Sequence, residues 1–271
     1  MMQTNVTVIL PSWTLFDEQK GKAQSYLEGS KFQVLYLLHG GTGDDSDYVN
    51  FSNIVRYADD NKVAVIMPCG YNSGYKNEAE DALPWPKRYW DFIFDELPRV
   101  CSAMFPISTN REDTFVAGLS MGSMAATQWA IYGAERCSAA LLMSGGGMDT
   151  SSIMAAVNQD NNGSTDFEVN EAGLAAMGIK LVDPDNDLYR TARENVSKGK
   201  PLPKIFMTVG GDDFIKIFAT ASRDLLVKYG YDVVYEEVPG YTHDWDFWDL
   251  SLRKAMYEWL PLRRDVIVSM P

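Results

Sequence analysis

The chain has 271 residues, a length that suits one large domain with a single core. It carries 37 acidic and 24 basic residues, so its net charge is −13 at pH 7. Such a surface repels phosphate backbones and anionic lipids, which argues against nucleic-acid and membrane partners.

Short runs of strand-forming residues alternate with amphipathic stretches along the chain. The runs at 33–39, 63–68 and 139–145 are almost continuously apolar, as strands buried on both faces are. The first run stands close to a polar turn, and we expect it to be an antiparallel edge strand. The predicted strands are 5–10, 33–39, 63–68, 114–118, 139–145, 204–210 and 232–238.

Helical patterns separate or follow these strands. Pro98 lies inside the second pattern and predicts a kink or a broken first half, because proline lacks the N–H that a helix uses. The alternation of strand and helix predicts a doubly wound α/β fold in a single domain over residues 1–271. The predicted helices are 48–60, 88–104, 121–134, 216–229 and 246–260.

The segment 149–200 interrupts the alternation. It is rich in Asn, Asp and Gly, as in NQDNNGSTDFEVNEAG, and it contains no strand pattern. Two interpretations stay open. The segment is either a surface excursion with one or two helices, or a small lid over a pocket at the loop end of the sheet.

The stretch TFVAGLSMGSMAATQWAIYG has a serine where a strand turns into a helix. A Gly-x-Ser-x-Gly at such a turn exposes the serine hydroxyl above the sheet. Gly118 and Gly122 have no Cβ, so strand and helix can approach closely. Free N–H groups at the start of the helix, that of Met121 first, would face an anion that forms beside Ser120. The pattern predicts a nucleophile at Ser120.

A serine hydroxyl needs a base near neutral pH, and histidine is the usual one. Of the two histidines only His243 follows Ser120, as the order Ser, Asp, His of this architecture requires. The acid that orients the histidine should lie between them at the end of a strand, and KIFMTVGGDDF offers Asp212 and Asp213. Weaker candidates, which follow no predicted strand, are Asp183, Asp185 and Asp187.

Four motifs, LHGGTGDDSDY, GLSMGS, GGDDF and GYTHDWDFW, occur in this order along the chain. In order and rough spacing they resemble the esterase D-like branch of α/β-hydrolases over about residues 5–262. That branch includes tributyrin, acetyl and feruloyl esterases, S-formylglutathione hydrolases and mycolyltransferases. The resemblance implies an α/β-hydrolase fold, with a mostly parallel central sheet, helices on both faces and a small polar insertion at about 149–200.

The resemblance also implies roles for single residues. Ser120 would be the nucleophile, His243 the base and Asp213 the acid, since the family has its acid directly before a phenylalanine. HGG at the end of an early strand resembles the oxyanion loop of serine hydrolases. Backbone N–H groups of Gly41 and Met121 would then stabilise the oxyanion.

His39 is the last residue of an early apolar strand. We expect its side chain to form structural hydrogen bonds rather than to react.

Two tryptophans near the motifs are candidates for substrate contacts. Trp85 lies in LPWPKRYW and Trp245 follows His243, and either ring could stack on a sugar or an aromatic acyl group. The alternative is that both rings pack against the fold.

These inferences predict a serine carboxylesterase for short-chain acyl esters, including acetyl or feruloyl esters of carbohydrates. Alternatives are an S-formylglutathione hydrolase, an acyltransferase, and a catalytically silent binding protein of the same fold. We expect no metal or organic cofactor, since no cluster of His and Cys has ligand spacing. The expected partner is a small-molecule or oligosaccharide ester, and the resemblance is compatible with a homo-oligomer.

The N-terminal stretch MMQTNVTVILPSW has neither the basic region nor the cleavage site of a secretory signal. No apolar run approaches the ~18 residues that a membrane span needs. Cys69, Cys101 and Cys137 are far apart and odd in number, so they fit neither a disulfide framework nor a zinc site. We therefore expect a cytoplasmic protein in which the cysteines are small buried hydrophobes.

Overall fold

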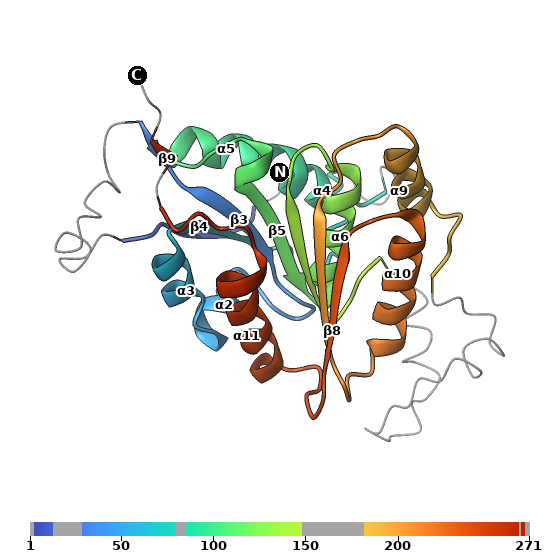
Figure 1. Cartoon of the computed structure of the whole chain (residues 1–271). Helices are drawn as coiled ribbons and strands as arrows, with labels where there is room; N and C mark the ends of the chain where they lie inside the picture. Colours follow the sequence, from blue (N-terminus) through green and yellow to red (C-terminus); the bar gives the residue numbers. More distant parts are fainter. Residues whose placement is uncertain (1–2, 13–28, 80–84, 148–181, 266, 269–271) are drawn as a thin grey trace.

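A seven-stranded sheet forms the centre of the molecule (Figure 1). The structure, a computed structural model, describes residues 3–12, 29–79, 85–147, 182–265 and 267–268. The strand order is β1-β4-β3-β5-β6-β7-β8. The strands are β1 Val6–Ile9, β3 Gln33–Leu38, β4 Val63–Pro68, β5 Thr114–Leu119, β6 Ala139–Met143, β7 Lys204–Gly210 and β8 Val233–Val238.

The pairing of the strands confirms the predicted sheet. Neighbouring strands from β4 to β8 run parallel. β1 lies at the edge and pairs with β4 in the antiparallel direction, with Val6 opposite Pro68, as we expected. A second, two-stranded sheet joins β2 (Ser30–Lys31) to β9 (Ile267–Val268). The sequence did not predict it, because a strand of two residues has no periodicity.

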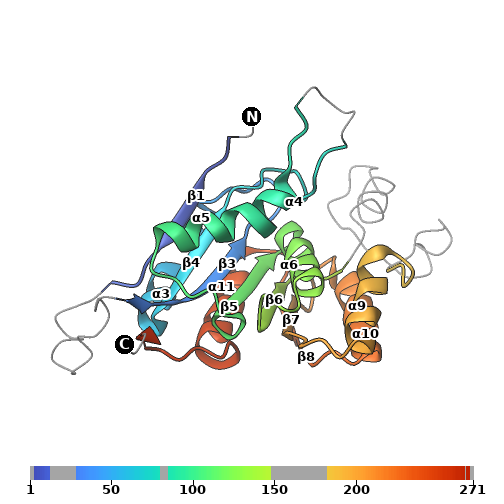
Figure 2. The ribbon, with the colours of Figure 1, turned by 90° about the horizontal axis from the view of Figure 1, so that it is seen from above.

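Helices cover both faces of the sheet. In Figure 2, α3 and α11 lie on one side of the strands, and α6, α9 and α10 lie on the other. The predicted helix 48–60 is divided into α2 and α3, because Ser52 adopts an extended backbone between them. The helices are α2 Asp47–Phe51, α3 Ile54–Asn61, α4 Tyr89–Asp91, α5 Leu97–Met104, α6 Met121–Tyr132, α9 Asp187–Ser197, α10 Lys216–Tyr229 and α11 Trp245–Lys254.

Side chains alternate between two hydrophobic cores along each buried strand. In β3, Tyr36 and Leu38 belong to the core beneath α5, α6, α9 and α10, whereas Leu35 and Leu37 belong to the core beneath α2, α3 and α11. This alternation is the period of two of an extended chain. Every residue of β3, β4 and β6 is buried, which explains their almost continuously apolar composition.

The helix that contains Pro98 changes geometry just before the proline. It runs as α4, then as a π-helical turn at Phe92–Glu96, and then as α5, whose first turn holds Pro98. A proline in the first turn of an α-helix removes no hydrogen bond of that helix. The π-helical turn ends at Glu96, two residues before the proline. The predicted break is therefore confirmed as a change of helix type.

The polar segment 149–200 is described only from residue 182 onward, so most of the predicted insertion lies outside the described residues. Its described part contains α9, which begins after Asn186. The Asn186 side chain accepts a hydrogen bond from Tyr189 N at 2.9 Å and so caps the helix. The buried side of α9, which includes Tyr189, joins the core. The lid interpretation stays a prediction.

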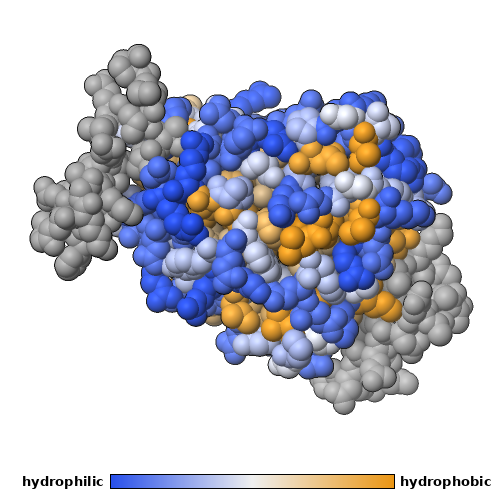
Figure 3. Space-filling model, viewed as in Figure 1, coloured by the Kyte–Doolittle hydropathy of each residue, from blue (hydrophilic) through white to orange (hydrophobic). Residues whose placement is uncertain are grey.

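Polar residues cover much of the outer surface. Figure 3 shows hydrophilic residues over most of one face, with smaller apolar areas between them. None of the helices in the described ranges is long and apolar enough to cross a membrane.

Cys69, Cys101 and Cys137 are free and buried, and burial raises the pKa of the Cys137 thiol to about 12. The cysteines are therefore small apolar core residues, as predicted.

Asp113 connects the C-terminal segment to the amino end of β5. Its side chain is 0% exposed and accepts hydrogen bonds from Ser108 Oγ at 2.6 Å and from Gln33 Nε2 at 3.4 Å. Arg263, from the segment after α11, pairs with the same carboxylate. One buried acid thus holds three parts of the chain together.

Asp113→Ala should lower the free energy of unfolding by about 3 kcal/mol, because it leaves buried donors without their acceptor. Urea unfolding followed by circular dichroism measures the loss. Glu112→Ala is the matched control. The side chain of Glu112 is 73% exposed and pairs with Arg111 at the surface, so its loss should cost less than about 0.5 kcal/mol. Equal losses in the two variants would contradict the role of Asp113.

Candidate active site

Ser120 lies on the turn between β5 and α6. Its backbone has φ 51° and ψ −117°, a conformation that costs a non-glycine residue about 1–3 kcal/mol. A Cβ on Gly118 would lie 2.2 Å from Gly122 O, and one on Gly122 would lie 2.1 Å from Leu38 O. Only glycine at both positions lets α6 begin this close to β5 and β3. The packing therefore holds Ser120 in its strained turn at the end of the strand.

His243 lies in the loop between β8 and α11. Its Nε2 atom is 3.0 Å from Ser120 Oγ, although the two residues are 123 positions apart in the sequence. The next residue, Asp244, fixes the loop because its side chain caps α11 and accepts a hydrogen bond from Phe247 N at 3.0 Å. The Thr242 hydroxyl donates to the same carboxylate and lowers its pKa. The histidine is thus attached to the rigid start of a helix.

Asp213 follows β7 and is the third member of the contact chain. Its carboxylate oxygens lie 3.0 and 3.1 Å from His243 Nδ1, and one of them accepts a hydrogen bond from Ile215 N at 3.0 Å. A Cβ on Gly210 would lie 2.3 Å from Tyr241 O. The glycine therefore allows the end of β7 to approach the loop that carries the histidine.

The other acidic candidates lie elsewhere. Asp212 is exposed, and its backbone N–H donates to Tyr241 O at 3.0 Å. Asp187, at the start of α9, pairs with Arg190 at the surface. The structure thus brings Asp213 to His243. It does not bring there the remaining candidates, which are Asp183, Asp185, Asp187 and Asp212.

Aromatic rings enclose the imidazole of His243. The centre of the Phe214 ring lies 4.7 Å from it, and that of Trp248 lies 5.0 Å from it in perpendicular orientation. Trp248 is itself fixed, because its indole N–H donates to the buried Ser144 Oγ at 2.9 Å. Trp245 packs edge-on against Trp248, with 5.3 Å between ring centres. These contacts leave the imidazole little freedom to turn.

His39 connects the ends of β3 and β4. Its Nε2 accepts a hydrogen bond from Gly70 N at 2.8 Å, and its Nδ1 donates to Gly40 O at 2.7 Å. These partners require the neutral tautomer with its proton on Nδ1. Burial lowers the pKa of His39, which keeps the ring neutral. The expectation of a structural role for this side chain is confirmed.

The hydrogen bond to His39 also orients the next peptide group. Because Gly40 O points at His39 Nδ1, the N–H of Gly41 in the same trans peptide points the opposite way. A Cβ on Gly40 would lie 3.5 Å from Ser120 Cβ, so this peptide is next to the serine. Within the described ranges, neither Gly41 N nor Met121 N donates a hydrogen bond. Both groups are available to an anion beside Ser120.

The two tryptophans predicted near the site lie in different places. Trp245 belongs to the aromatic cluster beside His243, where it also contacts Tyr48 with 5.3 Å between ring centres. Trp85 is 78% exposed and lines a pocket whose lining does not include Ser120.

Among the residues that the structure describes, no group of three or more His, Cys, Asp or Glu could hold a metal ion.

Three supports of this site were missed in the sequence. Phe214 stands directly after Asp213 in GGDDF, and that position could have indicated it. Ser144 and Gly70 carry no such signal. Each acts through one contact with a residue that is 104 or 31 positions away in the sequence, and no local pattern records such a contact.

The strand order, the serine on the turn from β5 to α6 and its contact with His243 define an α/β-hydrolase fold. Solved structures agree. The fluorophosphonate-binding serine hydrolase FphF of Staphylococcus aureus matches with a TM-score of 0.72 and 26% identity, over 96% of this chain and 93% of that one. The S-formylglutathione hydrolase FrmB of the same organism matches with a TM-score of 0.68 and 26% identity, over 95% and 90%.

The chain belongs to the esterase family, whose model, described as "Putative esterase", matches residues 18–258. An acetyl esterase of Caldicellulosiruptor saccharolyticus is 31% identical over 272 residues, which cover 96% of this chain and 94% of the relative. The resemblance that the motifs indicated is confirmed. The protein is an enzyme of the serine hydrolase class that acts on carboxylic esters.

His39→Gln should flatten the dependence of stability on pH between 7 and 5.5. Burial lowers the pKa of His39 in the folded protein, whereas in the unfolded chain histidine takes up a proton below about pH 6.5. The contribution of the neutral ring is therefore present above pH 6.5 and is lost as the pH falls toward the folded-state pKa. Thermal unfolding at both pH values should show a larger loss of Tm for wild type. Equal losses would refute this role.

Trp248→Phe should lower kcat for ester hydrolysis about fivefold with little change in KM. The variant keeps a ring beside His243 but loses the hydrogen bond to Ser144, which is worth about 1 kcal/mol. The imidazole then spends more time turned away from the serine. Trp259→Phe is the matched control, since Trp259 stacks on Phe206 in the same core, with 5.5 Å between ring centres. A similar fall of kcat in both variants would contradict the prediction.

Proposed function

We propose that this protein is a serine carboxylesterase that hydrolyses short-chain acyl esters through an acyl-enzyme on Ser120. One observation carries the proposal. His243 lies 3.0 Å from Ser120 Oγ on one side and 3.0 Å from Asp213 on the other. A hydroxyl at hydrogen-bond distance from an imidazole that a carboxylate orients is the arrangement that activates oxygen nucleophiles.

The first step forms the acyl-enzyme. His243 Nε2 takes the proton of Ser120 Oγ while this oxygen attacks the ester carbonyl. Asp213 accepts a hydrogen bond from Nδ1–H of His243 and stabilises the imidazolium that results. The N–H groups of Gly41 and Met121 stabilise the oxyanion, and one such donor is worth about 3 kcal/mol in the transition state. The intermediate then collapses, and the alcohol leaves with the proton from His243.

The second step releases the acid. A water molecule occupies the position of the departed alcohol and gives a proton to His243 Nε2 as it attacks the acyl carbonyl. The same two N–H groups stabilise the second oxyanion. Collapse returns the proton to Ser120 Oγ and frees the carboxylic acid. No group other than the three side chains and the two backbone donors is needed.

The substrates that we propose are acetyl esters, or feruloyl esters, of carbohydrates. The acetyl group is supported by the acetyl esterase that is 31% identical over 96% of this chain. A cytoplasmic location, with oligosaccharide esters as substrates, is part of the proposal. Three free and buried cysteines suit a reducing compartment.

Two other activities use the same three residues. S-formylglutathione hydrolysis is a candidate because FrmB, an S-formylglutathione hydrolase, is similar to this chain over 95% of this chain and 90% of FrmB. Transfer of the acyl group to an alcohol instead of water is the other. A catalytically silent protein would need a broken contact chain, and the contacts of Ser120, His243 and Asp213 argue against that alternative.

Ser120→Ala should lower the turnover of p-nitrophenyl acetate by at least about a thousandfold, because the attacking oxygen is lost. A fluorophosphonate should modify wild type at Ser120, as read by peptide mass mapping, and leave the variant unmodified. Ser123→Ala is the matched control. This buried hydroxyl has no partner among the described residues, so its removal should leave labelling and turnover intact.

Retention of most of the activity by Ser120→Ala would overturn the proposal. The same preparations, assayed with S-formylglutathione and with p-nitrophenyl acetate plus added methanol, separate the alternatives. Hydrolysis that is faster on the thioester would favour the first alternative. Accumulation of methyl acetate in preference to acetate would favour acyl transfer.

A further inference from the structure

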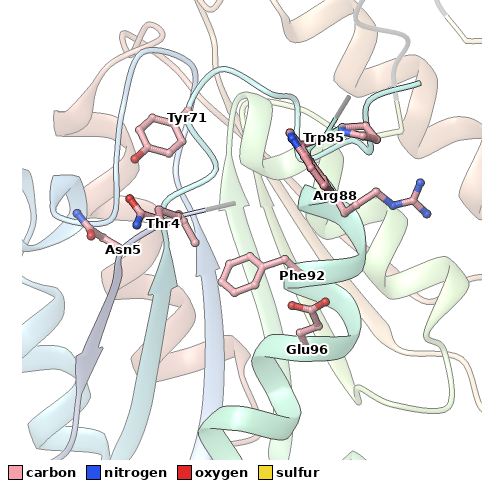
Figure 4. Close-up of a pocket in the computed structure, with 9 residues that line it drawn as sticks. Thr4, Asn5, Tyr71, Trp85, Arg88, Phe92 and Glu96 are labelled. Atoms are coloured by element: carbon pink, nitrogen blue, oxygen red, sulfur yellow. The ribbon is translucent and has the colours of Figure 1, made fainter. Parts of the chain in front are cut away.

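A pocket of about 930 Å³ lies beside the N-terminal segment. Figure 4 shows Tyr71 on one side of it and Trp85 on the other, with Phe92 between them. Its volume falls within the roughly 300–1,000 Å³ that is typical of small-molecule sites. The polar residues of its lining are Gln3, Thr4, Asn5, Arg88 and Glu96.

The two aromatic rings at the sides of this pocket are open to solvent. Trp85 is 78% exposed and Tyr71 is 50% exposed, whereas Trp129 in the core is 1% exposed. A tryptophan exposed to this extent adds little to the stability of the core. Its flat apolar face can pack on a ligand that presents C–H groups, while its N–H stays hydrogen-bonded to water.

The polar side chains of the pocket suit hydroxyl groups better than a charged ligand. Gln3 and Asn5 carry amides that both donate and accept, and Glu96 adds an exposed carboxylate. The guanidinium of Arg88 pairs with Asp91 at 2.8 Å, so its charge is compensated. The net charge of −13 adds to the cost of binding an anion. A neutral ligand with many hydroxyls and an apolar face is a saccharide.

The pocket lies at the same edge of the sheet as Ser120. Tyr71 follows Gly70, whose N–H donates to His39 in the loop next to the serine. β4, which leads to Tyr71, is the second strand from β5, which leads to Ser120. Neighbouring strands are about 4.8 Å apart, so the two strand ends are separated by about 10 Å. A disaccharide spans such a distance, and a single acylated ring does not.

We propose that this pocket is a subsite for a second sugar ring in the alcohol part of the substrate. The inference rests on the proposed esterase function. The ring that carries the acetyl group lies at Ser120, and the next ring stacks on Trp85, with Tyr71 on the opposite side of the pocket. The amides of Gln3 and Asn5 and the carboxylate of Glu96 bind its hydroxyls.

The test compares p-nitrophenyl acetate, monoacetylated methyl xyloside and monoacetylated xylobiose as substrates. In wild type, kcat/KM should be about tenfold higher for the acetylated xylobiose than for the acetylated methyl xyloside. Trp85→Ala should abolish this advantage, mainly through KM, and Trp85→Phe should restore part of it. Met104→Ala removes another exposed apolar side chain, 68% exposed at the end of α5, and should keep the advantage.

Binding without turnover provides the second measurement. Xylobiose is titrated into the Ser120→Ala protein by calorimetry, with and without Trp85→Ala. The second substitution should weaken binding at least tenfold. Absence of xylobiose binding, or an advantage of the disaccharide ester that survives in Trp85→Ala, would overturn the subsite alone. Failure of wild type to hydrolyse p-nitrophenyl acetate would overturn the esterase proposal instead.

Discussion

The contact of three backbone segments at Gly118, Gly122 and Leu38 is the constraint on which the site depends. The carbonyl oxygen of Leu38 lies where a side chain on Gly122 would be, so the start of α6 presses directly on the end of β3. Ten of the twelve residues of α6 are buried, and the helix cannot shift to relieve the turn that precedes it. The strain at Ser120, about 1–3 kcal/mol, is therefore retained in the folded protein. Its consequence is a hydroxyl whose position is set by the core and not by a mobile loop.

The other groups of the site are placed by the same edge of the sheet. His39 directly follows β3, Ser120 directly follows β5, and Asp213 follows β7. Parallel strands end at one edge, so residues far apart in the sequence converge there. His243 comes from the loop that enters α11, and Asp244 caps that helix. Each reactive or orienting group is thus within a few residues of a rigid element, which is what a site with tight geometry requires.

Much of this arrangement was predictable from the sequence, because its main signals are local. Continuous apolar runs predicted the buried strands, and Gly-Leu-Ser-Met-Gly predicted the turn at Ser120. The choice between Asp212 and Asp213 was not local. It depends on the direction that the chain takes after Gly210. This glycine has no side chain, and a Cβ on it would lie 2.3 Å from Tyr241 O. The hydrogen bond from Trp248 to Ser144 could likewise not be predicted, since its two residues are 104 positions apart in the sequence.

Charge at the carboxyl edge bears on the choice between neutral and anionic substrates. The loop that follows His39 carries Asp44, Asp45 and Asp47, and burial raises the pKa of Asp47. One unit charge at about 10 Å in water contributes about 0.4 kcal/mol, and salt at physiological strength screens interactions beyond about 8 Å. Three such charges at that separation would therefore disfavour an anionic ligand by a few-fold at most. The acidic residues of this loop therefore favour a neutral ligand over an anionic one only weakly.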